Sequence, residues 1–473
     1  MPIQFGTDGW RGIIADDFTF ENVRYCAQGV SDYILAQNLA NKGLIIGYDT
    51  RFSSEEFADT VAEVSAGNGI KTLLCDRPVP TPVVSYNVLF RGTGGACVIT
   101  ASHNPPQWNG FKFKPEYAGS ASPEIVDALE RHVLSSETRK YYKHVRWEQA
   151  MSQNIGSLID PSLPYLQHVS TLVDIDAIRN SGLRIVADPM YGAGAGYFTT
   201  LLEGGALNIV EIHDARNPIF PGMLQPEPVA KNLVELSDIV VREGYQAGLA
   251  LDADADRFGL IDEKGNYINP LQVLALLALY MLEVRGDKGP LVKSLTSSNM
   301  IYRLAEIFDV PVFETPVGFK YIGPTMIEKN ALLAGEESGG FGFRGHIPER
   351  DGILSGLFIL DMMVKMDKTP SELIEYLYSK VGPHYYRRDD ILYDPIIEES
   401  IKEKLNDITI DSIAGVNIKR IDQFDGTKFA LEDGSWLAIR FSGTEPLLRI
   451  YSEAKNEDLV DKLISEARNF VGV

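Results

Sequence analysis

Apolar runs that end in a polar or glycine-rich loop recur along the chain, and this repeated pattern constrains the fold more than any other feature. The pattern appears as GLIIGYDT (43–50), CVITASHN (97–104), RIVADPMYGAG (184–194) and GLALDADADRFG (248–259). Helical spacing of apolar residues over 21–38 precedes the first run. Buried strands that alternate with helices predict mostly parallel sheets covered by helices. Ligands bind at the ends of the strands in such sheets, so we look for chemistry in these loops.

The length of the chain predicts several domains. Its 473 residues exceed what one hydrophobic core usually serves, which predicts three or four domains. Weak boundaries lie within 136–162, 262–270 and 368–390. Beyond the last of these, charged helical stretches flank DGTKFALEDGSWLAIRF, where a DG turn and alternating apolar residues predict an antiparallel sheet. The last domain is therefore expected to differ in architecture.

The composition is that of a folded, acidic protein. Hydrophobic residues make up 45% of the chain and charged residues 23%, which is typical of a globular protein. The net charge is −21, whereas nucleic acids and anionic membranes require a basic surface, so we expect neither as a partner. A sugar phosphate remains compatible, because it needs only a local cluster of cations and N–H groups while distant charges are screened.

The cysteines and the start of the chain predict a cytoplasmic protein. Cys26, Cys75 and Cys97 form no C-x-x-C pair, which argues against a disulfide framework or a cysteine-rich zinc site. The start MPIQFGTDGWRG lacks the pattern of a signal peptide. The longest apolar helix candidate, LQVLALLALYMLEV, is too short to span a bilayer.

A candidate nucleophile follows the second apolar run. The segment TASHNPPQWNGFKFK (100–114) places Ser102 where a strand ends, and also contains His103 and Lys112. Asn-Pro, Pro-Pro and Asn-Gly all mark turns, so on this motif alone a plain turn is an equal alternative.

The segment DADADR (252–257) is a candidate metal site. In an extended backbone, Asp252, Asp254 and Asp256 would point to the same side. Their mutual repulsion would be relieved by a divalent cation, and carboxylate oxygens favour Mg²⁺. The alternatives are an exposed acidic loop, an EF-hand, which needs glycine where Arg257 stands, and an aspartate-nucleophile phosphatase of the haloacid-dehalogenase type.

Two further motifs suggest sugar and phosphate binding. In GEESGGFGFRGHIPERDG (335–352), Glu336 and Ser338 could bind sugar hydroxyls, with a glycine-rich hairpin as the alternative. In RFSGTEPLLRIYSEA (440–454), two arginines, two hydroxyls and turn N–H groups suit a phosphate, although a simple turn also fits. The lysines of VKSLTSS and TPVGFKY are, taken singly, better explained as surface charges. The segment YGAGAG (191–196) lacks G-x-G-x-x-G, which argues against NAD.

Taken in order, FGTDGWRG, TASHNP with NGFK, DADADR, GEESGG and RFSGTEP resemble the α-D-phosphohexomutase superfamily across the whole chain. The resemblance implies four domains around a central cleft, with three related mixed α/β domains followed by a smaller C-terminal α+β domain. The domains expected on this basis cover residues 1–150, 151–260, 261–375 and 376–473.

The resemblance also implies roles for individual residues. Ser102 would carry the phosphoryl group and would complete an Mg²⁺ site formed by Asp252, Asp254 and Asp256. The residues that would support phosphoryl and proton transfer are Arg11, His103, Lys112 and Arg257. The residues that would bind the substrate are Lys293, Gly318, Lys320, Glu336, Ser338, His346 and Arg350. The residues that would hold the non-reacting phosphate are Arg440, Ser442, Gly443, Thr444 and Arg449.

The expected activity is that of a phosphoglucomutase, acting on small hexose phosphates as a monomer or homodimer. It would interconvert glucose 1-phosphate and glucose 6-phosphate through glucose 1,6-bisphosphate, which also primes Ser102. Gly340 stands where the mannose- and glucosamine-type members commonly have histidine, and His346 would replace that histidine only if its loop folds back over the cleft. The alternatives are a glucose 1,6-bisphosphate synthase, a phosphomannomutase, and a metal-dependent phosphatase with Asp252 as nucleophile; a non-catalytic sensor is disfavoured.

Overall fold

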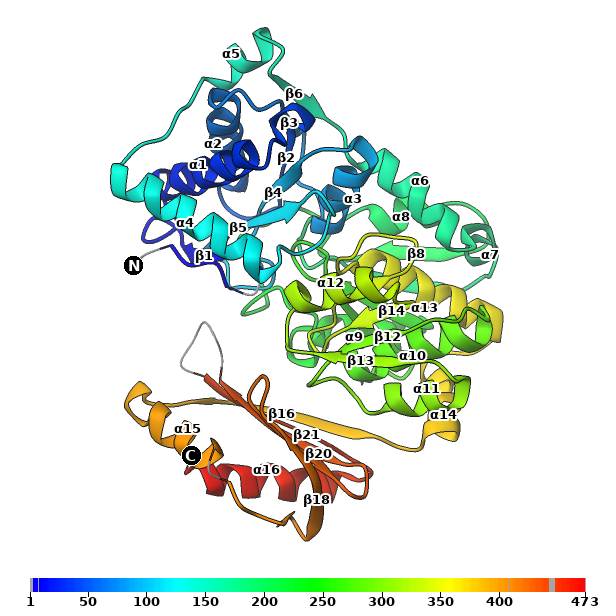
Figure 1. The fold of residues 1–473 in the computed structure, drawn as a ribbon. Helices are drawn as coiled ribbons and strands as arrows, with labels where there is room; N and C mark the ends of the chain where they lie inside the picture. The colour runs from blue at the N-terminus through cyan, green and yellow to red at the C-terminus, as the bar shows by residue number, and fades with distance from the viewer. Residues whose placement is uncertain (1–2, 7, 407, 442–446, 473) are drawn as a thin grey trace.

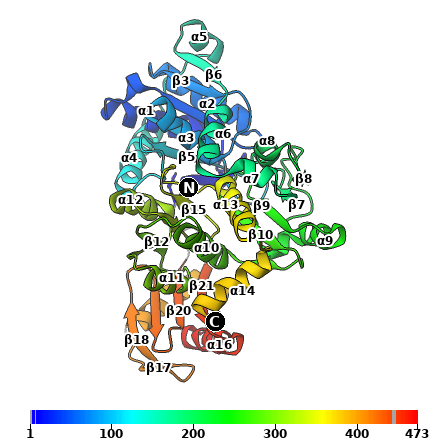
Figure 2. The same cartoon turned by 90° about the vertical axis from the view of Figure 1, so that its right-hand side faces the viewer.

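Four layered units follow one another along the chain of this computed structural model (Figure 1). The structure describes residues 3–6, 8–406, 408–441 and 447–472. Each unit is built on one β-sheet, and Figures 1 and 2 show the first unit at one end of the molecule, the fourth at the other, and the second and third between them. The expected series of three mixed α/β units and a different C-terminal unit is confirmed.

The first unit is a six-stranded mixed sheet with helices on both faces. Its strands are β1 (Trp10–Ile13), β2 (Leu44–Tyr48), β3 (Thr72–Cys75), β4 (Gly95–Ile99), β5 (Trp108–Pro115) and β6 (Gly156–Ile159). Its helices are α1 (Phe20–Ala36), η1 (Ala40–Lys42), α2 (Ser54–Gly67), α3 (Thr81–Arg91), α4 (Pro123–Arg139) and α5 (Trp147–Ser152). Ile46 packs in a core with α1, α2 and α4, whereas Ile45 packs against α3. Because both faces of β2 are buried, its sequence is a continuous apolar run.

The second unit is a five-stranded sheet with the order β11-β10-β9-β7-β8. Its strands are β7 (Arg184–Asp188), β8 (Asn208–Glu211), β9 (Ala247–Leu251), β10 (Phe258–Asp262) and β11 (Tyr267–Ile268). Its helices are α6 (Ser162–Leu172), α7 (Ile175–Arg179), α8 (Tyr197–Leu202), η2 (Ala230–Asn232) and α9 (Val234–Glu243). Val186 faces α9, whereas Ile185 faces a large core that the second and third units share.

The third unit is a four-stranded sheet with the order β13-β12-β14-β15. Its strands are β12 (Leu291–Ser294), β13 (Val312–Thr315), β14 (Leu333–Gly335) and β15 (Phe341–Phe343). Its helices are α10 (Pro270–Leu279), the π-helical η3 (Tyr280–Val284), α11 (Met300–Phe308), α12 (Phe319–Lys329), α13 (Gly352–Met366) and α14 (Pro370–Val381). A Cβ atom on Gly356 of α13 would lie 2.7 Å from the ring of Phe198 in the second unit. The two units therefore pack as one body.

The fourth unit is an antiparallel sheet with two helices on one face, as Figures 1 and 2 show. Its strands are β16 (Tyr385–Leu392), β17 (Ser412–Ile413), β18 (Val416–Asp422), β19 (Thr427–Leu431), β20 (Trp436–Phe441) and β21 (Leu447–Ala454). Its helices are η4 (Pro395–Ile397), α15 (Glu398–Asn406) and α16 (Glu457–Val471). The buried Trp436 packs with Leu295 of the third unit and so joins the two.

The paired strands suggest domain boundaries that differ from the expected ones. Residue 150 precedes β6, which pairs with β3 of the first sheet, and residue 260 lies inside β10. Residue 375 lies inside α14. Because a hydrogen-bonded strand or a helix belongs to a single unit, we propose boundaries after β6, after β11 and after α14.

The loops that carry the sequence motifs share one position in the first three sheets. Each loop joins a strand to an antiparallel neighbour, connecting β4 to β5, β9 to β10 and β14 to β15. The prediction of mostly parallel sheets missed these return strands. Alternating residues such as Phe111, Lys112, Phe113 and Lys114 of β5 are the local signal for them. The arrangement brings three motif loops to the ends of three sheets.

None of the helices in the described ranges is both long and apolar enough to cross a membrane.

Candidate active site

Ser102 lies in the loop between β4 and β5 and faces a carboxylate of the second unit. Its Oγ donates a hydrogen bond to Oδ2 of Asp252 at 2.8 Å and lies 3.4 Å from Nδ1 of His103. The backbone of Ser102 has a φ of 50°, in the left-handed region that non-glycine residues rarely adopt. A strained, buried serine beside a carboxylate and an imidazole is a candidate nucleophile.

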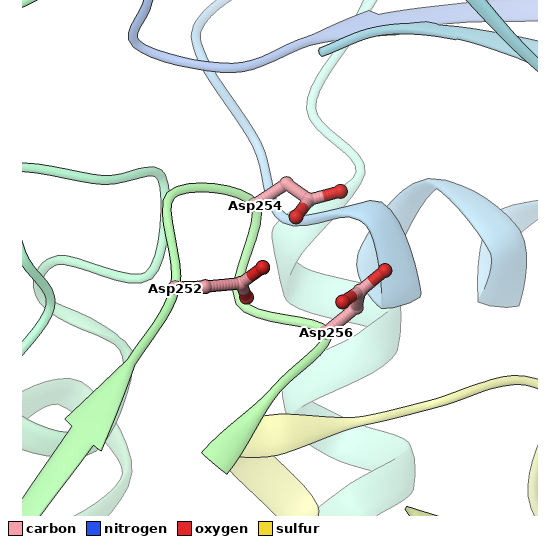
Figure 3. Close-up of side chains that lie close together, drawn as sticks. All are labelled: Asp252, Asp254 and Asp256. Atoms are coloured by element: carbon pink, nitrogen blue, oxygen red, sulfur yellow. The ribbon is translucent and has the colours of Figure 1, made fainter. Parts of the chain in front are cut away.

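Asp252, Asp254 and Asp256 converge because their loop curls. Ala255 has a φ of 56°, so the loop is a turn and not the extended backbone that the alternating sequence predicted. Figure 3 shows the three side chains directed toward a common space. All three are buried, and each offers an oxygen within 4.8 Å of the others. The predicted clustering is therefore present, with a different backbone conformation as its cause.

The donor set fits a hard divalent cation. Oδ1 of Asp254 and Oδ1 of Asp256 are buried and accept no hydrogen bond from the described residues. Burial, together with the neighbouring carboxylates of Asp254 and Asp256, raises the pKa of Asp252 well above its usual value. A cation bound by these oxygens would satisfy the free acceptors and offset the repulsion, and an oxygen-only site suits Mg²⁺.

Lys112 of β5 reaches the same carboxylates from the first unit. Its Nζ lies 2.8 Å from Oδ2 of Asp254, 3.1 Å from Oδ2 of Asp256 and 2.9 Å from Oδ2 of Asp8. Burial alone would lower the pKa of Lys112, but the three carboxylates raise it above its usual value. Lys112 is therefore a buried ammonium, and in this arrangement it neutralises part of the acidic cluster.

Arg350 connects the aspartate loop to the predicted sugar-binding loop. Its Nη2 lies 2.6 Å from Oδ2 of Asp8 and 2.8 Å from Oδ2 of Asp256. Its Nη1 lies 3.3 Å from Oε1 of Glu336, which also accepts a 2.6 Å hydrogen bond from Oγ of Ser338. One arginine thus touches carboxylates of the first, second and third units.

Three further predicted residues lie around Ser102. Nη1 of Arg11 donates to Oδ1 of Asn104, two residues beyond Ser102, and Nη1 of Arg257 donates to Oε1 of Glu227 at 2.9 Å. Burial, followed by the charges of Arg257 and Arg11, lowers the pKa of His103 well below its usual value. His103 is therefore neutral near pH 7 and able to accept a proton.

Four predicted substrate-binding residues make contacts outside this cluster. The buried Nζ of Lys293 lies 2.9 Å from Oε2 of Glu314, and Nζ of Lys320 lies 5.3 Å from the ring centroid of Tyr321. Gly318, with a φ of 119°, is the N-cap residue that immediately precedes α12. The fourth is His346.

The ring of His346 does not fold back over the cleft. Its side chain has no exposed surface, and its Nε2 lies 2.9 Å from Oδ2 of Asp351. The ring also stacks on His168, with the ring centroids 5.1 Å apart. The condition under which His346 would replace the missing histidine is therefore not met, because the carboxylate and the aromatic stack hold the ring inside the protein.

The predicted phosphate-binding arginines stand opposite each other on neighbouring strands of the fourth unit. Arg440 of β20 pairs with Arg449 of β21. Nε of Arg440 donates to Oδ1 of Asp425 at 2.9 Å, and Oδ2 of Asp425 accepts the N–H of Val317 in the third unit. The other predicted members, Ser442, Gly443 and Thr444, lie outside the described residues.

Sequence reasoning missed several residues of the cluster. Asp49 and Arg51 directly follow the first apolar run, so their place at a strand end was a usable signal. Lys114 lies two residues beyond Lys112 on the same face of β5 and pairs with Asp8 and Glu349. Thr81 donates a hydrogen bond to Oδ2 of Asp254 across 173 residues of sequence, and no local sequence pattern predicts this contact. The other missed residues include Asp8, which contacts Lys112 and Arg350, and Glu349, which contacts Lys114.

Four family models match successive segments of the chain. All are described as Phosphoglucomutase/phosphomannomutase: alpha/beta/alpha domain I matches residues 2–140, domain II 163–265, domain III 269–381, and the C-terminal domain 401–469. The four matches follow the order of the four units.

Known proteins resemble the chain over nearly its full length. A protein of Thermococcus kodakarensis named Phosphoglucomutase/phosphomannomutase is 31% identical over 460 residues, covering 96% of this chain and 95% of its own. A Phosphoglucosamine/phosphogalactosamine mutase of Sulfurisphaera tokodaii is 28% identical, with coverage of 99% and 98%. The crystal structure of a Thermus thermophilus protein whose description names phosphomannomutase has a TM-score of 0.86 and 32% identity, with 100% of both chains covered.

Proposed function

Because the chain belongs to the phosphoglucomutase/phosphomannomutase family, whose members are phosphohexomutases, we propose that it interconverts glucose 1-phosphate and glucose 6-phosphate through a phosphoserine at Ser102. The observation that carries the proposal is the 2.8 Å contact between Oγ of Ser102 and Oδ2 of Asp252, at the edge of the buried aspartate cluster. A hydroxyl in this position would carry a phosphoryl group directly beside the proposed metal ligands.

Asp252, Asp254 and Asp256 would hold Mg²⁺ together with an oxygen of phosphorylated Ser102. When bound, Mg²⁺ would neutralise the charge on the phosphoryl group during its transfer. The cationic side chains near Ser102 add to this stabilisation, since Arg11 and Arg257 lie close enough to lower the pKa of His103. These charges oppose the repulsion between a phosphorylated serine and a phosphorylated sugar.

Proton transfer falls to His103 or Lys112. His103 is neutral and lies 3.4 Å from Oγ of Ser102, so it suits the role of base as the structure stands. Lys112 is protonated while its ammonium contacts Asp254, Asp256 and Asp8, so it carries the proton that an acid would deliver. The pair would therefore supply the two complementary groups that a reversible transfer requires.

The bound sugar bisphosphate would reorient between two phosphoryl transfers, both of which take place at Ser102. Donation from Ser102 yields glucose 1,6-bisphosphate, and the return of its other phosphate to Ser102 yields the isomeric product. Arg440 and Arg449 would hold the phosphate that is not reacting. Glu336 and Ser338 would bind sugar hydroxyls, which supports a hexose substrate.

Glucose is proposed as the hexose on the basis of the loop GEESGG, in which Gly340 replaces the histidine of other members. A Cβ atom on Gly340 would lie 2.2 Å from Cδ of Arg350. A histidine at this position would therefore displace Arg350 from the carboxylates that it joins. The position of Arg350 thus requires a glycine at 340.

The test is ³¹P NMR of the purified protein with Mg²⁺ and glucose 1-phosphate, with and without glucose 1,6-bisphosphate. We expect glucose 6-phosphate to form with the wild type but not with Ser102→Ala. Ser65→Ala is the matched control, because Ser65 is equally buried and its hydroxyl has no hydrogen-bond partner in the described residues. If mannose 1-phosphate or glucosamine 1-phosphate is converted faster than glucose 1-phosphate, that sugar phosphate is the preferred substrate and the proposal of glucose is wrong. Accumulating bisphosphate would indicate a synthase, and phosphate release by wild type and Ser102→Ala alike would contradict the phosphoserine mechanism.

A further inference from the structure

One buried arginine binds the backbone of the Ser102 loop through its carbonyl groups. Nη2 of Arg51 donates to the carbonyl oxygens of Ser102 and Asn104, both at 2.5 Å. Its Nη1 donates to the carbonyl oxygens of Pro105 and Trp108 at 3.0 and 3.1 Å. Four carbonyl groups of one loop therefore point at a single guanidinium that is 0% exposed.

Asp49 completes the link between this arginine and the backbone of Ser102. Its Oδ2 lies 3.3 Å from Nε of Arg51 and accepts a 2.6 Å hydrogen bond from Oγ1 of Thr100. The same Oγ1 accepts the N–H of Ser102 at 2.8 Å. Both sides of Ser102, its N–H and its C=O, thus lead to the Asp49–Arg51 ion pair.

These contacts explain how Ser102 keeps its unfavourable backbone conformation. A left-handed φ costs a non-glycine residue about 1–3 kcal/mol and persists only where surrounding contacts enforce it. In a trans peptide the C=O and the following N–H point in opposite directions. The C=O of Ser102 points toward Arg51, so the N–H of His103 points away from it, and this N–H donates to no acceptor within the described residues.

The second unit holds the turn that carries Arg51. Nε of Arg216 donates to the carbonyl oxygen of Thr50 at 3.1 Å, and its Nη2 donates to that of Arg51 at 3.3 Å. The buried ring of Phe220 lies 5.0 Å from Cζ of Arg51. The unit that supplies the aspartate loop therefore also fixes the support of the serine loop.

We propose that Arg51 is a positioning residue for phosphoryl transfer: with Asp49 and Thr100, it holds the Ser102 loop so that Oγ faces Asp252 and the His103 N–H stays free for a phosphoryl oxygen. This inference rests on the proposed function. Arg51 touches no reacting atom and acts only through the loop. Lysine cannot replace it, because one ammonium lacks the planar set of donors that reaches four carbonyl groups.

The test measures the transfer of labelled phosphate from glucose 1,6-bisphosphate to dephosphorylated Ser102 by rapid quench, and the steady-state kcat and KM. We expect Arg51→Lys to lower both the transfer rate and kcat about 100-fold, as a misplaced reacting group does, with little change in KM. Arg179→Lys is the control, because Arg179 also donates to a carbonyl oxygen, that of Leu201, but lies in the second unit, whereas Arg51 lies in the first.

A second pair of variants covers the case in which Arg51→Lys fails to fold. Thr100→Val removes the hydroxyl that joins Asp49 to the Ser102 N–H, whereas Thr100→Ser keeps it. We expect Thr100→Val to lower the transfer rate about tenfold, because it removes the hydrogen bonds that the hydroxyl makes to Asp49 and to the Ser102 N–H, and Thr100→Ser to keep the wild-type rate. A purely structural role would lower the melting temperature of Thr100→Val but leave its transfer rate equal to that of Thr100→Ser.

The outcomes separate this inference from the proposed function. A wild type that takes up no label on Ser102 overturns the proposed function and this inference with it. Equal transfer rates in the wild type, Thr100→Val and any folded Arg51→Lys overturn the inference alone. Slow transfer in these variants, with normal rates in Thr100→Ser and Arg179→Lys, supports it.

Discussion

Nζ of Lys112 lies 2.8 Å from Oδ2 of Asp254, a carboxylate that is also a proposed metal ligand. The same ammonium contacts Asp256, a second proposed ligand, at 3.1 Å. A divalent cation would enter a space whose negative charge is already partly neutralised by this lysine. Lysine and cation therefore compete for the same carboxylates.

This competition predicts that Lys112→Met binds Mg²⁺ more tightly than the wild type. Loss of a nearby positive charge should lower the dissociation constant for Mg²⁺ about tenfold, equivalent to about 1.4 kcal/mol, while turnover falls. Titration calorimetry measures the affinity without any need for activity. Lys42→Met is the control, because Lys42 pairs with Glu116 on the surface. Unchanged or weaker binding in Lys112→Met would contradict the competition.

Asp252→Asn distinguishes a serine nucleophile from an aspartate nucleophile. Asp252 accepts the hydrogen bond of the Ser102 hydroxyl, so its replacement should slow transfer between Ser102 and the sugar at least about 100-fold in both directions, and phosphate that does load on Ser102 should stay there. Peptide mass spectrometry after incubation with glucose 1,6-bisphosphate locates the phosphate. Asp433→Asn, which alters a turn of the fourth unit, should behave like the wild type. Phosphate found on Asp252 in the wild type would establish the phosphatase-type alternative instead.

Gly192→Ala tests the packing beneath the aspartate loop. A Cβ atom at this position would lie 2.7 Å from both Cα and O of Ala253, between two proposed ligands, and backbone atoms cannot swing away. We expect a loss of about 1–3 kcal/mol in the free energy of unfolding and weaker Mg²⁺ binding. Chemical denaturation and calorimetry measure the two effects.

Gly196→Ala is the matched control for this substitution. Gly196 has a φ of 81°, and a Cβ atom added to it would have no neighbouring atom within 4 Å. An alanine at this position is therefore strained in its backbone but makes no steric clash. It should cost about 1–2 kcal/mol from backbone strain alone and leave Mg²⁺ binding unchanged. Equal Mg²⁺ affinities in the two variants would show that the clash does not reach the ligands.

Glu314 is expected to contribute a pH-dependent part of the stability. Burial would raise its pKa, but Lys293 and Lys428 outweigh this and lower the pKa from 4.5 to about 2. Because the folded-state pKa lies below the unfolded one, this contribution is complete above pH 4.5 and is lost as the pH falls toward 2.

Glu314→Gln should therefore flatten the acid limb of the stability curve. The variant should lose about 3 kcal/mol at neutral pH, because two buried lysines lose their shared counter-ion, and its unfolding free energy should vary less between pH 4.5 and 2 than that of the wild type. Urea denaturation at a series of pH values measures both. Glu328→Gln at the surface should reproduce the wild-type curve, and equal slopes in all three proteins would contradict the assignment.

Local patterns were enough to predict much of the fold and the main elements of the site. The apolar run at 43–50 and the helical spacing before it correspond to β2 and α1. Hydrophobic periodicity indicates which faces are buried, and it can be recognised from a short stretch of sequence. For the same reason Ser102 and the three aspartates could be found, since each motif lies in one short loop that follows one apolar run.

The tertiary structure alone decided which partners these residues have. Arg350 contacts Asp8 across 342 residues of sequence, and Lys114 contacts Glu349 across 235. His346 and Lys293 are predicted to meet the substrate, and in the structure their buried side chains contact Asp351 and Glu314, partners that no local pattern indicated. An ion pair or hydrogen bond depends on where two distant segments meet after packing, and no local propensity encodes that meeting. The sequence by itself therefore determined the chemistry available in each loop, whereas the assembly of the loops into one charged cluster was decided by the packing of the units.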